Sequence, residues 1–226
     1  MYAKCFKRVL DFVLSLCALI VLSPVLLVLT VLGAVKMKGN PFFTQLRPGK
    51  DEKIFKLIKF RTMTCETDEN GNLLPDEVRL TRYGKLLRST SLDELPELLN
   101  ILVGHMSIVG PRPQLVRDMV FMTPEQRRRH SVRPGLTGLA QCSGRNNITW
   151  EQKFDYDLQY IDGGITLLKD IKILLQTAEK VLKREDTVRE GTVSDMDFGD
   201  WLLAKGSIDR VRYEAGQVEA KELTRV

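Results

Sequence analysis

Cysteine and histidine are sparse in this chain, and their spacing does not fit a metal centre. Among 226 residues there are four cysteines and two histidines, His105 and His130. No two cysteines form a C-x-x-C pair, so the spacing disfavours a zinc site or a disulfide framework and fits a reducing cytosolic environment. The sequence also lacks G-x-x-x-x-G-K-S/T and G-x-G-x-x-G, which disfavours a nucleoside triphosphate loop and a Rossmann-type dinucleotide site.

Charge is absent from residues 12–35, a run long enough for a membrane segment. Basic residues flank the run on both sides, so the positive-inside rule prefers both ends on the cytoplasmic side. At its centre stand Ser23 and Pro24; the proline removes a backbone hydrogen bond, and the serine hydroxyl can satisfy the freed carbonyl. We interpret the run as a re-entrant helix-break-helix that dips into one leaflet of a phospholipid bilayer. A kinked spanning helix is the alternative that these residues leave open.

The net charge of +5 is spread unevenly along the chain. Residues 185–226 contain ten acidic and six basic residues, so this tail carries −4 and the first 184 residues carry +9. A basic body favours anionic partners. Nucleic acid, a phosphorylated metabolite and an anionic membrane leaflet all qualify on charge alone.

Residues 88–113, RSTSLDELPELLNILVGHMSIVGPRP, are the stretch with the most chemistry. Pro96 is tolerated only near the start of a helix, so we expect Asp93 to be the N-cap and Glu94 to lie at the positive end of the helix dipole. A structural cap is one interpretation of this pair. A Mg²⁺-phosphate site is the other, because two carboxylates lie near Arg88 and Arg112, and Mg²⁺ is typically held by one or two carboxylates plus substrate phosphates. We expect a buried apolar stripe along this helix, made of Leu95, Leu98, Leu99 and Leu102.

The segments around this stretch predict short strands and helices. Residues 40–63 are rich in strand formers after turn residues, which indicates a β-hairpin. Residues 64–78 are acidic and contain an Asn-Gly turn, so we expect an exposed loop. Residues 114–130 predict a helix or a pair broken at Thr123-Pro124, and residues 165–184 have the 3.6-residue apolar periodicity of an amphipathic helix. That helix suits either core packing or the membrane interface.

Residues 132–150 and 185–226 are charged and show no clear helical or strand periodicity. Residues 132–150 mix glycines with Arg133 and Arg145, a composition that lets backbone N–H groups and guanidinium groups approach a phosphate. Residues 185–226 have little periodicity, and we expect a mobile or partner-binding C-terminal tail.

Several of these motifs together resemble the bacterial sugar transferase family, the monotopic phosphoglycosyl transferases. The resemblance covers about residues 1–184 and lies in the Ser-Pro-centred hairpin, Lys59-Phe60-Arg61, Thr90-Ser91-Leu92-Asp93-Glu94-Leu95-Pro96, Gly110-Pro111-Arg112-Pro113, Arg133-Pro134-Gly135-Leu136-Thr137-Gly138 and Tyr156-Asp157. One departure is His105, where the family usually has aspartate, and its role stays open.

The resemblance implies a fold and a division of the chain. The expected class is α+β, mainly α, with a re-entrant membrane hairpin over 1–38, a catalytic domain of short strands and interfacial amphipathic helices over 39–184, and a tail over 185–226. It also implies a location at the cytoplasmic face of the bacterial inner membrane. The implied partners are a UDP-sugar, polyprenol phosphate and the bilayer, with no nucleic acid.

The resemblance further implies a two-step reaction that starts lipid-linked glycan assembly. Asp93 is expected to attack the β-phosphorus of the UDP-sugar, to release UMP and to pass the sugar phosphate to polyprenol (undecaprenyl) phosphate. Asp93 and Glu94 are the expected Mg²⁺ ligands, and Asp157 has an expected supporting or metal role. The expected phosphate contacts are Lys59, Arg88, Arg112 and Arg145.

Two other classes of protein remain as alternatives. An aspartyl-nucleophile phosphatase would need D-x-D-x-T/V, which is absent. A non-catalytic membrane-associated scaffold would explain the membrane segment and leave Asp93 as a cap.

Overall fold

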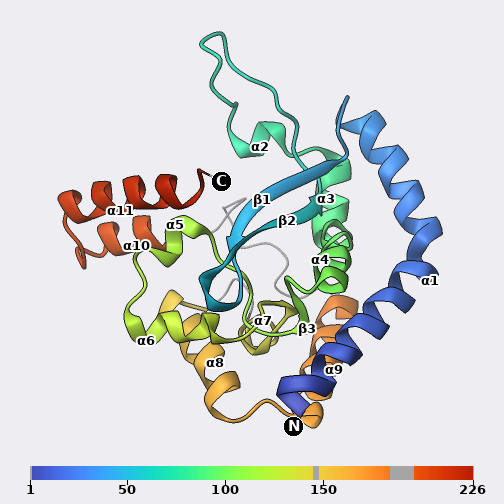
Figure 1. Ribbon diagram of the computed structural model, residues 1–226. Helices are drawn as coiled ribbons and strands as arrows, with labels where there is room; N and C mark the ends of the chain where they lie inside the picture. Colours follow the sequence, from blue (N-terminus) through green and yellow to red (C-terminus); the bar gives the residue numbers. More distant parts are fainter. Residues whose placement is uncertain (1, 145–147, 184–195, 226) are drawn as a thin grey trace.

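The computed structural model describes residues 2–144, 148–183 and 196–225. The described chain is mainly helical, with two small sheets and one long apolar helix at its N-terminus. Figure 1 shows this helix along one side of the domain and the last two helices on the opposite side. The expected α+β class with a predominance of helix is confirmed.

The apolar run forms α1 (Lys7–Lys36), preceded by the π-helical turn η1 (Tyr2–Phe6). The helix has 30 residues and is long and apolar enough to cross a membrane by length and composition. The helix is continuous through Ser23 and Pro24, so the prediction of two separate helices is wrong. It curves along its length (Figure 1). Ser23 Oγ donates to the carbonyl oxygen of Ile20, 2.8 Å away, the group that Pro24 leaves without its helical partner. This hydroxyl contact keeps the helix continuous.

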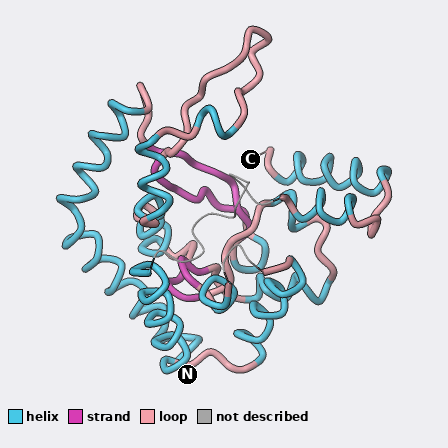
Figure 2. The backbone as a smooth tube through the Cα atoms, turned by 180° about the vertical axis from the view of Figure 1, so that it is seen from behind, coloured by secondary structure: helices cyan, strands magenta, loops and turns pink. Residues whose placement is uncertain are grey.

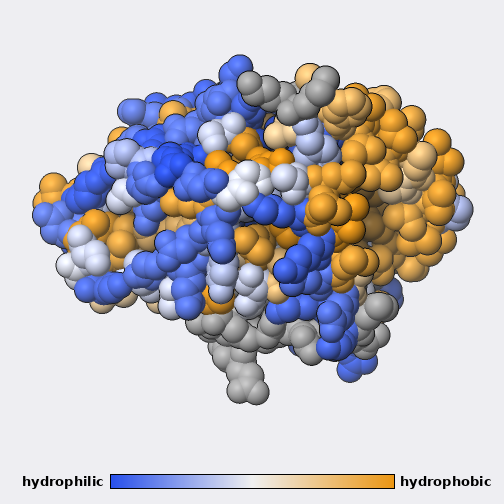
Figure 3. Space-filling view, turned by 90° about the horizontal axis from the view of Figure 1, so that it is seen from below, coloured by the Kyte–Doolittle hydropathy of each residue, from blue (hydrophilic) through white to orange (hydrophobic). Residues whose placement is uncertain are grey.

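The concave face of α1 packs along the domain, and its other faces are exposed. Ala18, Leu19 and Leu22 pack against a cluster that includes the buried Leu98 and Ile101. Apolar side chains gather over the side of the molecule on which α1 lies (Figure 3). This arrangement is compatible with membrane association. It leaves the re-entrant topology a prediction.

The expected hairpin is confirmed as β1 (Phe42–Pro48) and β2 (Ile54–Phe60), joined by the 3-10 turn η2 (Lys50–Glu52). The strands are antiparallel, with Phe43 opposite Lys59. The following segment projects from the domain as a long loop that ends in α2 (Asp76–Arg79) (Figure 2). The second sheet is a parallel pair, β3 (Ser107–Val109) and β4 (Gly135–Thr137).

Two helices lie between the hairpin and α1 (Figure 1). They are α3 (Arg82–Ser89) and α4 (Glu97–Val103), with the 3-10 turn η3 (Leu92–Glu94) between them. Asp93 therefore lies in η3, and the N-cap of α4 is Pro96 itself, which corrects the expected cap. The expected stripe is also partly wrong, because Leu99 is 42% exposed while Glu97 and Asn100 are buried.

The rest of the domain consists of short helices and one long amphipathic helix. Of the two expected alternatives for residues 114–130, the pair of helices broken at Thr123-Pro124 is confirmed, and Thr123 caps the second helix. The amphipathic helix is confirmed as α9 (Leu167–Lys183), with Leu168 and Leu175 exposed and Ile173 buried. The elements are α5 (Val116–Met119), α6 (Pro124–Arg127), η4 (Arg128–Ser131), α7 (Leu139–Ser143), α8 (Trp150–Asp162) and α9 (Leu167–Lys183).

The described part of the C-terminal tail is a pair of helices packed on the domain. These are α10 (Phe198–Ala204) and α11 (Arg210–Leu223), and we call residues 196–225 the C-terminal hairpin. Phe198 and Ala220 join a core cluster with Phe121 and Phe154 of the domain. The expectation of a mobile tail does not hold for this part of the chain.

Candidate active site

A sharp turn and a side-chain amide position the acidic stretch. Ser91 adopts the left-handed conformation with φ 56°, so the chain reverses between α3 and the turn that carries Asp93 and Glu94. Asn100 fixes α4 against the neighbouring strand, because its Oδ1 accepts the N–H of Ile58 at 3.0 Å and its Nδ2 donates to the carbonyl of Lys56 at 2.7 Å. The start of α4 is thus held beside the end of β2.

Glu94 lies between two cations from different parts of the chain. Lys59 Nζ is 2.8 Å from Glu94 Oε1, and Arg112 contacts the same oxygen. Burial alone disfavours the charged carboxylate, but attraction to Arg112 and Lys59 outweighs burial and lowers the pKa of Glu94. Glu94 is therefore anionic at neutral pH, with its charge compensated by the chain itself.

A third carboxylate, Glu97, lies at the same cluster and was missed by the sequence analysis. Its side chain is 1% exposed, and Oε1 lies 3.0 Å from Lys59 Nζ. Burial raises the pKa of Glu97. The signal that could have found it is position: Glu97 follows Pro96 in the first turn of α4, so it lies on the same side as the preceding acidic turn.

Asp93 differs from its neighbours because its carboxylate is not committed to a cation. In the part of the chain that the structure describes, no hydrogen bond or ion pair engages Asp93. Burial and the adjacent Glu94 charge raise the pKa of Asp93 to about 6, although Lys59, Arg112 and Arg88 act in the opposite direction. A partly desolvated, unpaired carboxylate beside cations is a suitable nucleophile toward a phosphate.

The two arginines reach the cluster from separate supports. Arg88, at the end of α3, donates through Nε to Thr62 Oγ1 at 3.1 Å. Arg112 lies in the loop after β3. The backbone of this loop passes close to that of Arg133, which requires a glycine: a Cβ on Gly110 would lie 2.6 Å from the carbonyl oxygen of Arg133. The structure thus brings Lys59, Arg88 and Arg112 to the Asp93–Glu94 pair.

Asp157 does not reach the carboxylates and instead forms a buried ion pair with Arg129. Arg129 Nη2 lies 2.6 Å from Asp157 Oδ2, and both residues are 2% exposed. The same Nη2 donates to the carbonyl oxygen of Arg112 at 2.7 Å. Asp157 therefore supports Arg112 through Arg129, a link that the sequence analysis missed. Arg145 lies outside the described residues.

Asp93 and Glu94 are the residues that would hold a Mg²⁺ ion completed by substrate. The described residues contain no group of three or more histidine, cysteine or acidic side chains placed to hold a metal by themselves. Asp93 and Glu94 offer two adjacent carboxylates, the kind of donor set that holds Mg²⁺ together with phosphate oxygens. Such an ion would neutralise phosphate charge at the site.

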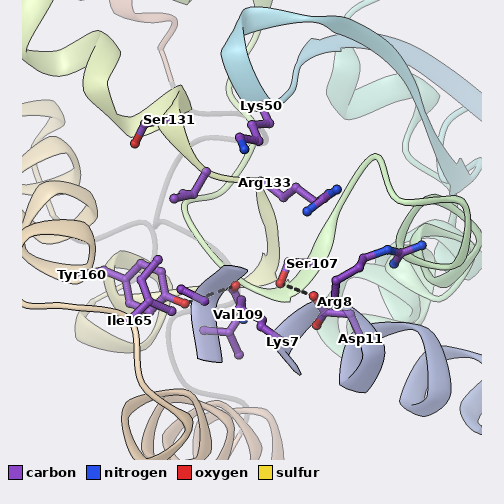
Figure 4. Close-up of a pocket in the computed structure, with 12 residues that line it drawn as sticks. Lys7, Arg8, Asp11, Lys50, Ser107, Val109, Ser131, Arg133, Tyr160 and Ile165 are labelled. Carbon is purple, nitrogen blue, oxygen red and sulfur yellow. Dashed lines mark hydrogen bonds between the residues drawn. The ribbon is translucent and has the colours of Figure 1, made fainter. Parts of the chain in front are cut away.

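A separate hollow lies beside the first turns of α1 (Figure 4). Its polar contacts attach the helix to the domain: Asp11 accepts the hydroxyl of Ser107 at 2.7 Å and the N–H of Ile108 at 3.0 Å. Arg8 donates to the carbonyls of Ile101 and Leu102, at the C-terminal end of α4. Asp93 and Glu94 do not line this hollow and precede the opposite end of α4.

Comparisons with known proteins show the family of this chain. The family model described as bacterial sugar transferase matches residues 2–184. The chain belongs to the bacterial sugar transferase family. It is 49% identical over 179 residues to the uncharacterized sugar transferase EpsL of Bacillus subtilis (strain 168), across 79% of this chain and 88% of that protein.

Two named transferases are also similar. The UDP-glucose:undecaprenyl-phosphate glucose-1-phosphate transferase of Klebsiella pneumoniae is 42% identical over 185 residues, which cover 77% of this chain and 40% of that protein. The transferase of the same name from Caulobacter vibrioides is 36% identical over 190 residues, across 80% of this chain and 71% of that protein. The chain thus spans less than half of one of these relatives and most of the other.

Proposed function

We propose that this protein is a Mg²⁺-dependent phosphoglycosyl transferase that moves a sugar phosphate from a UDP-sugar to polyprenol (undecaprenyl) phosphate and so starts lipid-linked glycan assembly. Family membership and the names of the similar transferases support this reaction class. The observation that carries the mechanism is the contrast between two adjacent carboxylates. Glu94 is held by Lys59 and Arg112, whereas Asp93 is free to react.

The proposed chemistry has two balanced steps. An Asp93 carboxylate oxygen attacks the phosphorus that carries the sugar, the bond from that phosphorus to the UMP oxygen breaks, and UMP leaves with the bonding electrons. An oxygen of polyprenol phosphate then attacks the same phosphorus and releases the Asp93 carboxylate. The product is a polyprenyl diphosphate sugar.

The cations around the pair reduce the cost of bringing a carboxylate to a diphosphate. Arg112 and Lys59 neutralise Glu94 in the free protein, and they lie close enough to Asp93 to oppose the rise in its pKa. Preorganised charges of this kind stabilise charge that develops on the transferring phosphate and the leaving group. Arg88, placed by Thr62, adds a third positive charge.

The geometry of α1 supports a re-entrant topology at the cytoplasmic face of the bacterial inner membrane. Both ends of the helix contact the same domain: Arg8 bonds to α4, and the carbonyl of Leu29 accepts the Tyr83 hydroxyl at 2.9 Å. A helix that crossed the bilayer would carry its two ends to opposite sides. One domain on one side of the membrane satisfies both contacts.

The test is release of UMP. Detergent-solubilised full-length protein is incubated with Mg²⁺, polyprenol phosphate and each of a panel of UDP-sugars, and wild type is compared with Asp93→Asn. We expect UMP from at least one UDP-sugar with wild type and none with the variant, and a phosphosugar adduct on the Asp93 peptide when polyprenol phosphate is withheld. Equal product from Asp93→Asn contradicts the covalent route, and no UMP from any UDP-sugar favours the scaffold.

A further inference from the structure

The C-terminal hairpin lies beyond the residues that the family model matches, yet it is closely fitted to the domain. Phe121 lies between its two helices. A Cβ added to Gly199 would lie 2.5 Å from the Phe121 ring, and one added to Gly216 would lie 2.4 Å from it. Arg212 donates to the carbonyl of Val120 at 2.9 Å. Such a fit requires both glycines and one docked arrangement of the helices.

Phe198, the first residue of α10, is a buried contact between the hairpin and the domain. It is 3% exposed, and its ring meets Phe154 of α8 edge to face at a centroid distance of 5.0 Å. Its backbone N–H donates to Asp118 Oδ1 at 2.9 Å. Asp118 also accepts the N–H of Leu115, so it joins the hairpin to the segment that directly follows the Arg112 loop.

Phe154 in turn shields the ion pair that supports Arg112. The guanidinium carbon of Arg129 lies 5.8 Å from the centre of the Phe154 ring, and Arg129 is paired with Asp157. A buried ion pair keeps its geometry only while its surroundings exclude water and its hydrogen bonds are satisfied. Arg129 also holds the Arg112 carbonyl, so contacts run without interruption from Phe198 to the loop that carries Arg112.

We propose that the C-terminal hairpin is a positioning element of the active site. Phe198 packs on Phe154, which covers Arg129, and the hairpin thereby holds Arg112 against Glu94. Phe198 is a positioning residue, since it touches none of the reacting groups. Its effect on turnover rests on the proposed function. Its effect on the Arg112 loop does not.

The first measurement needs no turnover. Amide hydrogen exchange of full-length Phe198→Leu is followed by mass spectrometry in peptides that cover residues 108–120. Leucine keeps the site apolar but loses the ring edge, so we expect exchange there to be about threefold faster or more than in wild type. Tyr213→Phe is the matched control, because it removes the 2.5 Å hydroxyl contact to Asp200 within the same hairpin and leaves Phe198 untouched. This control should exchange like wild type.

The second measurement separates positioning from general loss of stability. We expect Phe198→Leu to lower kcat/KM for the UDP-sugar about tenfold at a temperature well below its unfolding transition. In an Arg112→Lys background the guanidinium that Phe198 positions is already absent, so adding Phe198→Leu should not lower kcat/KM any further. A merely structural role would lower both backgrounds equally.

These outcomes decide the proposal in both directions. Unchanged exchange over 108–120 in Phe198→Leu overturns it, and so does a full additive loss in the Arg112→Lys background. If Phe198→Leu does not fold, Gly199→Ala replaces it; the added methyl pushes α10 off Phe121 and should speed exchange in the same peptides to a smaller extent. If wild type releases no UMP, the proposed function fails while the exchange comparison still decides the positioning role.

Discussion

Replacing Asp93 with asparagine should stabilise the protein near neutral pH while it removes turnover. The ordinary pKa of 3.8 rises to about 6 in the folded chain, through burial first and then the Glu94 charge. At about 1.36 kcal/mol for each step of one in pKa, the ionised carboxylate costs the folded state roughly 3 kcal/mol. An asparagine amide carries no charge and avoids this cost, but it supplies no nucleophilic oxygen.

The stability gain of Asp93→Asn has a defined dependence on pH. Below about pH 4 the Asp93 carboxyl is protonated in both the folded and the unfolded chain, so variant and wild type differ little. Between about pH 4 and 6 the unfolded carboxyl loses its proton first, and wild type therefore loses stability relative to the variant. Above that window the difference is constant at roughly 3 kcal/mol.

Thermal unfolding in detergent, with chelator present and pH varied from about 4 to 8, measures this difference. For a chain of this size, roughly 3 kcal/mol corresponds to a rise of about 6 to 12 °C in Tm at pH 7.5. Glu94→Gln is the matched control with the opposite sign. Arg112 and Lys59 stabilise the Glu94 charge, so Glu94→Gln should melt lower than wild type at pH 7.5. The difference should stay nearly constant down to the ordinary glutamate pKa of 4.5 and shrink only below it.

Two results would refute this reasoning about Asp93. One is a variant that melts below wild type at pH 7.5, which would mean that the carboxylate is stabilised by the folded chain. The other is a gain of the same size at pH 4 and pH 7.5, which would mean that the asparagine acts through packing and not through charge.

Four further predictions concern activity and topology. The kcat/KM for UMP release should fall below about pH 6, because Asp93 must be ionised to attack; a flat profile down to pH 5 contradicts this. Chelation of divalent ions should abolish UMP release and Mn²⁺ should partly restore it, because the expected metal ligands are oxygen atoms. Full activity in excess chelator contradicts a metal requirement. Glu97→Gln should lower kcat/KM about tenfold, because Lys59 loses a partner that fixes it, and wild-type kinetics would remove Glu97 from the site. Tags at both termini should react only with cytoplasmic reagents, and a periplasmic N-terminus refutes the re-entrant membrane hairpin. The double change Ser23→Leu and Pro24→Ala should shift α1 toward a spanning topology and lower activity.

Local patterns predicted the regular elements of this fold well. The apolar periodicity of residues 165–184 became α9, and the strand formers after Asn40 became the β1–β2 hairpin. The hydroxyl of Ser23 does bond the carbonyl that Pro24 leaves free, but that contact preserves one helix where two were expected. The prediction of a break failed because proline weakens a helix locally, and a single side-chain contact is enough to continue it.

The parts that sequence reasoning missed depend on tertiary fit. Asp93 looked like an N-cap because Pro96 follows it, yet the left-handed Ser91 starts a 3-10 turn that moves the cap to Pro96 itself. The helices of the tail carry few periodic apolar residues. They dock because Gly199 and Gly216 admit the Phe121 ring, a complementarity between distant segments that no local pattern encodes.

If α1 lies in a bilayer, as we propose, its attachment makes α4 a spacer between that bilayer and the proposed active site. Arg8 fixes the first turns of α1 to the C-terminal end of α4 and Asp11 fixes them to β3, whereas the proposed catalytic pair precedes the N-terminal end of α4. Seven helical residues span about 10 Å. Under the proposed function, a tilt of α1, such as bilayer thickness imposes on a membrane helix, would change the height of Asp93 above the lipid headgroups. Reaction with the proposed acceptor phosphate would then be coupled mechanically to the membrane.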